Sequence, residues 1–200
     1  ADEPLPVSQD PFISIDNYPG VVGFYEQRSF WAGTRNNPNK FWLSRSGSPE
    51  DLTSGVIDDD GFSFSIAGDF NIIRWAASMK TLLFGSAGGE GRISSDVTGE
   101  PLTIGNAFIR RETNYGAEPV MPILIGNSVI YVQRLGRKLR EYTYDSSLES
   151  WGSENLSILA DHLTSTANAG SITELAYTKE PLSVIWAKRS DGKLLGLTHD

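Results

Sequence analysis

The sequence has 200 residues and a formal charge of −8 at pH 7, so it repels nucleic-acid phosphates unless a local basic patch intervenes. It contains no cysteine, which excludes disulfides, thiolate metal sites and cysteine nucleophiles. Hydrophobic residues make up 39% of the chain, and its 20 glycines and 10 prolines favour many short strands joined by tight turns.

The first predicted segment, residues 1–17, is rich in proline and acidic residues and is typical of an extended lead-in. A second interpretation makes it a closing strand. In that case the apolar run Phe12–Ile15 would complete the last repeat of a ring.

From residue 18 onward the chain follows a repeating pattern of short apolar strands and polar turns. One predicted strand of each repeat carries an aromatic residue, and these strands align on Trp31, Phe84, Tyr131 and Trp186. The spacings between the four aromatic residues are 53, 47 and 55 residues. A period of about 50 residues is typical of the four-stranded blades of a β-propeller.

The aromatic strands are predicted to be the second strands of their repeats, at residues 30–33, 83–86, 130–132 and 184–187. First strands are predicted at residues 21–25, 72–75, 122–125 and 172–177. Third strands are predicted at residues 40–44, 91–94, 138–144 and 193–197. Fourth strands are less regular, and residues 62–66 and 107–110 are the best candidates. Residues 155–165 break the pattern with helix-like apolar spacing, which predicts either a short inserted helix or a loop docked by its leucines.

These elements predict an all-β fold of about four propeller-like blades over residues 18–200, the last blade incomplete. The sequence begins without Met and stops directly after the third strand of its fourth repeat. We therefore expect a piece of a larger propeller. The alternative is a four-bladed ring closed by the lead-in.

The sequence predicts no metal and no cofactor. Its two histidines, His162 and His199, lack ligand spacing to each other or to acids. The run Asp58–Gly61 lacks the alternating acids and distal Glu of a calcium loop, so a solvated hairpin turn is favoured. The glycine-rich run Gly85–Gly91 matches neither phosphate-binding pattern, and its glycines fit a turn between strands.

No catalytic residues are predicted either. Glycoside hydrolysis, a chemistry known from propellers, needs two carboxylates that face each other across a groove. The candidates Glu26, Asp69, Glu90 and Glu141 lie on different repeats, so sequence spacing cannot test their geometry. A propeller hydrolase is the third functional hypothesis.

A basic cluster stands out in this acidic chain: Arg134, Arg137, Lys138 and Arg140. It could form a salt-sensitive contact with an acidic neighbouring subunit or with DNA phosphates. It could equally be a solvated hairpin whose charges protect a strand edge from aggregation. Both interpretations stay open.

Several stretches, in this order and spacing, resemble the tail tubular, hub or nozzle proteins of short-tailed double-stranded DNA phages. They cover residues 18–200 and are Tyr18-Pro19-Gly20, Phe24–Arg28, Trp31–Thr34, Asn36–Pro38, Trp42–Gly47, Asp58–Asp60, Ile73–Trp75, Gly85–Glu90, Tyr115-Gly116, Gly136–Glu141, Asp161–Thr164 and Leu195–Thr198.

The resemblance implies a structural virion protein of the tail, assembled in the host cytoplasm and without enzyme activity. It implies a ring, expected to be a hexamer, that contacts neighbouring tail and adaptor proteins and lines the DNA exit channel. DNA would pass through without specific binding. No stretch approaches the roughly 20 apolar residues that cross a membrane, so no membrane partner is expected. The leading alternative is a propeller module that binds a glycan or a protein ligand.

Overall fold

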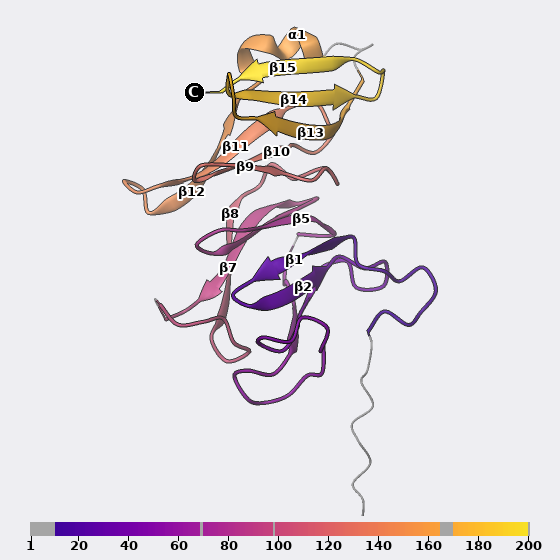
Figure 1. Ribbon diagram of the computed structural model, residues 1–200, viewed down its shortest axis with the longest axis vertical. Coiled ribbons are helices and arrows are strands. Elements are labelled where there is room, and N and C mark those ends of the chain that lie inside the picture. The colour runs from indigo at the N-terminus through magenta and orange to yellow at the C-terminus, as the bar shows by residue number, and fades with distance from the viewer. Residues whose placement is uncertain (1–10, 69, 98, 165–169, 200) are drawn as a thin grey trace, which may run out of the picture.

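A computed structural model describes residues 11–68, 70–97, 99–164 and 170–199 of the chain. Its strands form four antiparallel sheets, each a meander in which consecutive strands pair (Figure 1). The first sheet consists of β1 (Val21–Tyr25), β2 (Arg28–Ala32), β3 (Lys40–Leu43) and β4 (Phe62–Ser65). The second consists of β5 (Ile73–Ser78), β6 (Leu82–Ser86), β7 (Gly89–Ser95) and β8 (Ala107–Thr113).

The third sheet consists of β9 (Ile123–Ile125), β10 (Ser128–Val132), β11 (Leu139–Asp145) and β12 (Ser150–Asn155). The fourth has three strands, β13 (Ile172–Thr178), β14 (Val184–Arg189) and β15 (Leu194–Thr198). The prediction of an all-β, propeller-like fold with an incomplete fourth blade is therefore confirmed, and the sheets are called blades 1 to 4 below.

The connection between blades 3 and 4 holds the helical residues. A 3₁₀ turn, η1 (Ile158–Ala160), leads into the short helix α1 (Asp161–Thr164), within the segment for which the sequence left a short helix and a docked loop open. Residue 165 lies outside the described residues. No helix in the described ranges is long and apolar enough to cross a membrane.

Hydrophobic cores fill the spaces between successive blades, and the second strand of each inner blade contributes to the cores on both its faces. All five residues of β6 are buried, as are all five of β10. Side chains alternate across a strand. Thus Phe84 faces the core shared with blade 1, and Leu83 faces the core shared with blade 3. Ile130 and Val132 of β10 belong to the third core, shared by blades 3 and 4.

Equivalent hydrogen bonds fasten each blade to the next at one edge of the molecule. In a meander, the loop between the second and third strands lies at the same edge as the connection to the following blade. At each junction a backbone N–H of that connection or of the strand it enters donates to a carbonyl in this loop or at the end of the second strand. The bonds are Ile73 N to Pro38 O (2.9 Å), Ala117 N to Ser86 O (2.8 Å) and Ile172 N to Gly136 O (2.7 Å).

Glycine permits two of these junctions. Gly33 and Gly136 have φ angles of 69° and 70°, a left-handed conformation that glycine adopts without a steric penalty. A Cβ atom on Gly33 would also lie 2.8 Å from the carbonyl oxygen of Ile73, and one on Gly136 would lie 2.6 Å from the Cβ of Ser171. At Gly33 and Gly136 these loops therefore approach the next blade closely because glycine has no side chain.

The four blades form an open arc, with blades 1 and 4 at opposite ends of the long axis (Figure 1). The closing-strand interpretation of Phe12–Ile15 is wrong, because residues 11–17 form turns and bends and add no strand to blade 4. Phe12 instead packs on Trp31 and Trp42, with ring centroids 5.8 and 5.3 Å away, and so covers part of the outward face of blade 1. Residues 1–10 of the predicted lead-in lie outside the described residues.

Candidate functional site

The four predicted contact residues lie in and beside the loop that joins β10 to β11, and the structure separates them. Arg134 and Arg137 are exposed, Lys138 is half-buried, and Arg140 is buried with 8% of its surface exposed. The two buried or half-buried residues therefore do not belong to a free basic patch. Arg134 and Arg137 are the two members of the cluster whose side chains are exposed.

Arg140 points into the space between blades 2 and 3. Its Nε donates to Gln133 Oε1 at 2.7 Å, and its Nη1 donates to the carbonyl oxygen of Ser153 at 2.8 Å. The guanidinium carbon lies 3.4 Å from the ring centroid of Tyr115, a cation–π contact. These contacts tie β11 to β12 and to the connection from blade 2, so Arg140 is a structural residue.

A buried carboxylate lies in the same interface. Glu90 of β7 is fully buried and accepts hydrogen bonds from the Thr113 hydroxyl and, at 3.3 Å, from Tyr115 N. Burial raises the pKa of Glu90, while these hydrogen bonds and the charge of Arg140 act in the opposite direction. We call Glu90, Thr113, Tyr115, Tyr131 and Arg140 the interblade polar cluster.

Tyr131 completes the cluster from blade 3. Its hydroxyl forms a 2.9 Å hydrogen bond with Ser153 Oγ, and its ring lies 5.3 Å from that of Trp75 across the blade boundary. Burial and the neighbouring Glu90 raise the pKa of Tyr131, so the phenol stays protonated. A carboxyl with a raised pKa beside a tyrosine can act as a general acid. However, Glu90 has no exposed surface through which a substrate could reach it.

The other carboxylates considered for glycosidase chemistry are bound elsewhere. Glu26, in the β1–β2 turn, accepts a hydrogen bond from Leu102 N at 2.7 Å. Glu141 of β11 lies 3.4 Å from His199 Nε2, across the boundary between blades 3 and 4. With Glu90 they occupy three different blades, and each has its own structural partner. Asp69 lies outside the described residues.

The main-chain carbonyls of the acidic run Asp58–Asp60 bind the side chain of Arg28 from the same chain. The Arg28 guanidinium donates to the carbonyl oxygens of Asp58, Asp59 and Asp60 at 2.5, 3.3 and 2.8 Å, and to that of Ser44 at 2.7 Å. Burial lowers the pKa of Arg28, although the nearby carboxylates oppose this shift. Asp58 and Asp59 lie in an exposed turn, as favoured from the sequence, and the buried Arg28 guanidinium organises the main chain of that turn.

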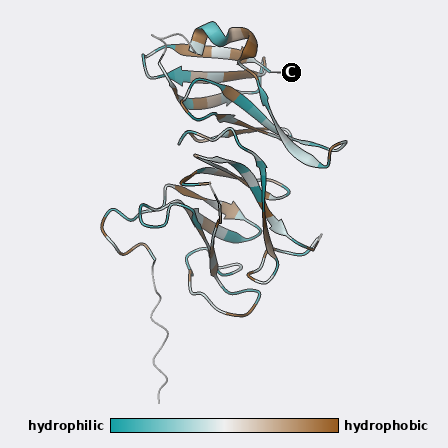
Figure 2. Ribbon diagram, turned by 180° about the vertical axis from the view of Figure 1, so that it is seen from behind, coloured by the Kyte–Doolittle hydropathy of each residue, from teal (hydrophilic) through white to brown (hydrophobic). Residues whose placement is uncertain are grey.

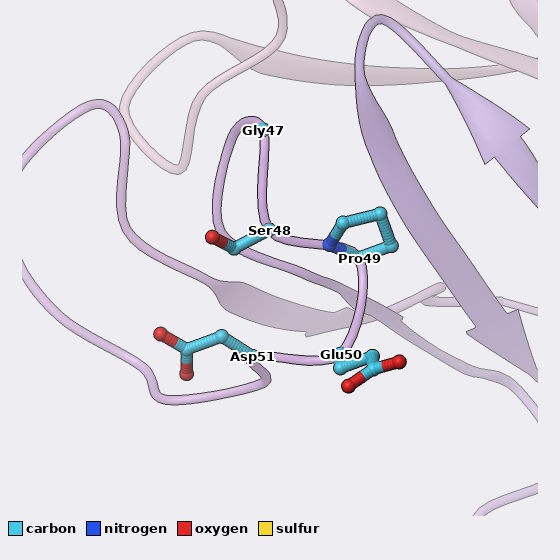
Figure 3. A pocket seen from close by; sticks show the side chains of 5 residues that line it. All are labelled: Gly47, Ser48, Pro49, Glu50 and Asp51. Carbon is cyan, nitrogen blue, oxygen red and sulfur yellow. The ribbon is translucent and has the colours of Figure 1, made fainter.

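An open hollow lies in the same long β3–β4 connection, and Figure 3 shows its lining, Gly47–Asp51. The carboxylates of Glu50 and Asp51 point away from each other (Figure 3). Asp51 Oδ1 accepts a hydrogen bond from Thr53 N at 2.9 Å, and hydrogen bonding by Thr53 lowers the pKa of Asp51. In the described parts of the chain, no group of three or more His, Asp or Glu could hold a metal ion.

A smaller apolar hollow lies between blades 3 and 4. It is lined by residues of β11, η1, α1 and all three strands of blade 4, among them Leu139, Ala160, Leu163, Leu195 and Leu197. Its wall carries no charged side chain. The hollow can therefore accommodate apolar side chains, but its wall offers no charged group for acid–base catalysis.

Comparisons with known proteins add little to this description. No family model matches the chain, and no curated protein matches it. Among solved structures, a luciferin-regenerating enzyme is similar to it with a TM-score of 0.31 and 11% sequence identity, covering 92% of this chain and 74% of that one. Similarity at this level supports no statement about activity.

Proposed function

We propose that this chain is a structural component of a phage tail, of the tubular, hub or nozzle kind, within a ring that surrounds the DNA-ejection channel. The sequence resemblance over residues 18–200 is the source of the tail assignment. One observation carries the structural role. The buried charged groups Arg28, Glu90 and Arg140 are all used to hold loops and blades together.

The proposed partners are other copies of the chain, expected to form a hexamer, and neighbouring tail or adaptor proteins. DNA would pass through the ring without specific binding. The net charge of −8 supports this, because a wall that repels phosphates does not hold DNA in place by counterion release. The proposed location is the virion tail, after assembly in the host cytoplasm.

Two exposed arginines, Arg134 and Arg137, are the proposed contact with an acidic neighbouring subunit or with DNA phosphates. The loop that carries them is fixed at both ends. Arg134 N donates to Gly116 O at 2.9 Å, and Gln133 N donates to Lys138 O at 2.9 Å. A fixed loop presents its charges in a defined place, which favours a specific contact.

A glycan-binding module would need exposed aromatic residues that line one groove. Among the described residues, the exposed aromatic side chains on strands, Phe24, Phe108, Tyr144 and Trp186, lie on four different blades, and two more, Tyr18 and Tyr115, lie before blade 1 and between blades 2 and 3. This alternative therefore gains no support from the arrangement of these side chains.

The test is the state of assembly together with the location of the protein. Native mass spectrometry at increasing concentration should detect a closed ring, and peptides of the chain should be found in purified virions. A chain that stays monomeric at high micromolar concentration and is missing from purified particles would refute the proposal.

A further inference from the structure

The long β3–β4 connection exposes two aliphatic side chains among carboxylates. Val56 is 94% exposed and Ile57 is 67% exposed. The surrounding residues 50–60, called the acidic tip below, contain five acidic residues and no basic residue. Of these acids, Asp58 and Asp59 directly follow the aliphatic pair and are exposed. An apolar centre with a charged rim is the composition of a protein-binding surface, and the charge of this rim favours a basic partner.

The acidic tip is held in a fixed position. The buried Arg28 guanidinium binds the main-chain carbonyls of Asp58–Asp60. Gly47 N, nearer the start of the connection, donates to Gln27 O at 3.0 Å and so ties it to the β1–β2 turn. Because the backbone is already ordered, a partner that binds the tip causes little further loss of conformational entropy.

The β10–β11 loop has the same composition with the opposite charge. Leu135 is 74% exposed, and the exposed residues Arg134 and Arg137 lie on either side of it. Lys138, which is half-buried, adds a third positive charge. Glu118 accepts a hydrogen bond from Leu135 N at 2.7 Å and supports the loop from below. Three cationic side chains against this carboxylate leave residues 133–138, called the basic loop below, with a positive charge.

The acidic tip and the basic loop lie at opposite edges of the blades. In a meander, the loop after the second strand and the loop after the third strand lie at opposite edges. The basic loop is at the edge of the interblade junctions, where Ile172 N donates to Gly136 O. The acidic tip is at the other edge, on the side of the β1–β2 turn. Blades 1 and 3 also lie in different halves of the molecule, as Figure 1 and, from behind, Figure 2 show. The two surfaces therefore do not meet within one copy of the chain.

We propose that the acidic tip binds the basic loop of a second copy of this chain. The exposed aliphatic side chains form the centre of the contact, and the carboxylates of Asp58 and Asp59 pair with the guanidinium groups of Arg134 and Arg137. The partner is a second copy because each copy carries both halves of the contact on opposite edges. Elsewhere the copies repel each other, since each has a net charge of −8, so this local complementarity sets their orientation.

Such a contact is head-to-tail. Each copy uses its acidic tip on one neighbour and its basic loop on the other, so the series continues until a ring closes. The inference rests on the arginine contact proposed above, for which it names the partner surface. It does not require that the protein belongs to a phage tail.

Paired charge reversals test this proposal. Arg134→Glu with Arg137→Glu makes the basic loop acidic, and Asp58→Lys with Asp59→Lys makes the acidic tip basic. Each double variant alone should self-associate at least about tenfold more weakly than the original chain in analytical ultracentrifugation at low ionic strength. An equimolar mixture of the two should recover the association to within about threefold, because every tip then meets a loop of opposite charge in an alternating series.

A matched control changes the net charge equally at a different place. Lys80→Glu with Lys179→Glu lies on the exposed β5–β6 and β13–β14 turns, outside both surfaces, and should associate as the original chain does. Circular dichroism verifies that each variant is folded. If the two lysines disturb the acidic tip, Asp58→Asn with Asp59→Asn replaces them and should weaken association by about threefold or more.

The outcomes separate this inference from the proposed function. If the arginine reversal weakens association but the acidic-tip variants do not, or the mixture of folded variants fails to recover it, the arginines bind another surface. In that case this inference is wrong while the proposed arginine contact stands. If neither reversal weakens association, both are wrong. An original chain that stays monomeric at millimolar concentration and low ionic strength also overturns the inference.

Discussion

Replacing Arg28 with methionine should destabilise blade 1 strongly, because the aliphatic stem is kept while every donor of the guanidinium is removed. The side chain is 4% exposed and donates four hydrogen bonds to main-chain carbonyls. Hydrogen bonds that involve a charged group contribute about 1.5–3 kcal/mol each, but the outer carbonyls can turn to water once the arginine is gone. We therefore expect a loss of about 3–5 kcal/mol, as for breaking a buried charged pair.

Urea unfolding measures this loss. The Arg28→Met variant should unfold at a lower urea concentration, and proteolysis should cut the Asp58–Asp60 loop first, because its carbonyls have lost their common donor. Arg28→Lys keeps the charge but not the planar fork of donors, so it should recover at most about half of the loss. Arg35→Met, at an exposed position, is the control and should change stability by less than about 0.5 kcal/mol. A loss below about 1 kcal/mol for Arg28→Met would refute the role given to this guanidinium.

Three further predictions concern one glycine, one buried acid and the exposed arginines. Gly33→Ala should lower stability by about 1–3 kcal/mol in thermal unfolding, since φ is 69° and the new Cβ would meet a carbonyl of β5; Gly47→Ala, at φ 71° in open space, should cost only about 1 kcal/mol. The raised pKa of Glu90 means that the folded state holds its proton above the ordinary value of 4.5, where the unfolded state has lost it. Stability from this group is thus present below that value and is lost as pH rises through the folded pKa. In urea unfolding, the free energy of unfolding of Glu90→Gln relative to the original chain should therefore increase as pH rises above 4.5 through the folded pKa. A difference that stays constant with pH would contradict the raised pKa of Glu90. Charge reversal at Arg134 and Arg137 together should leave the unfolding midpoint within about 0.5 kcal/mol of the original while weakening ring assembly in native mass spectrometry; unchanged assembly would exclude them as the contact.

The blade pattern could be predicted from the sequence because the second strands of the two inner blades, β6 and β10, are buried along their whole length and are therefore largely apolar. Such strands stand out as short aromatic and aliphatic runs, for example around Phe84 and Tyr131. The strand β12 could not be found in this way. Its sequence, Ser-Trp-Gly-Ser-Glu-Asn, contains one large apolar residue, because an outermost strand faces a core with few of its side chains. Tertiary pairing with β11 decides its conformation.

The residues of the interblade polar cluster could be predicted from the sequence only in part. The alternation of β11 placed Arg140 on the same face as Tyr142, which is fully buried, and this was the available signal that Arg140 points inward. Glu90 gave no comparable signal, because its partners, the Tyr115 backbone N–H and the Tyr131 side chain, are distant in the sequence and lie in the following connection and blade. The binding of Arg28 to the Asp58–Asp60 loop involves carbonyl groups, which every residue carries, so no residue pattern reports it.

The buried charged groups Glu90 and Arg140 have structural partners in the space between blades 2 and 3. A carboxylate that works as a general acid needs both a shifted pKa and a path along which a substrate can arrive. Glu90 has the first, yet it has no exposed surface and accepts hydrogen bonds from Thr113 and Tyr115. Arg140 beside it is fixed by Gln133 and by the backbone of β12. Removing a partner from such a group leaves a buried charge uncompensated, so separating the blades is costly. Charges placed in this way resist the separation of blades 2 and 3, which fits the structural role proposed above.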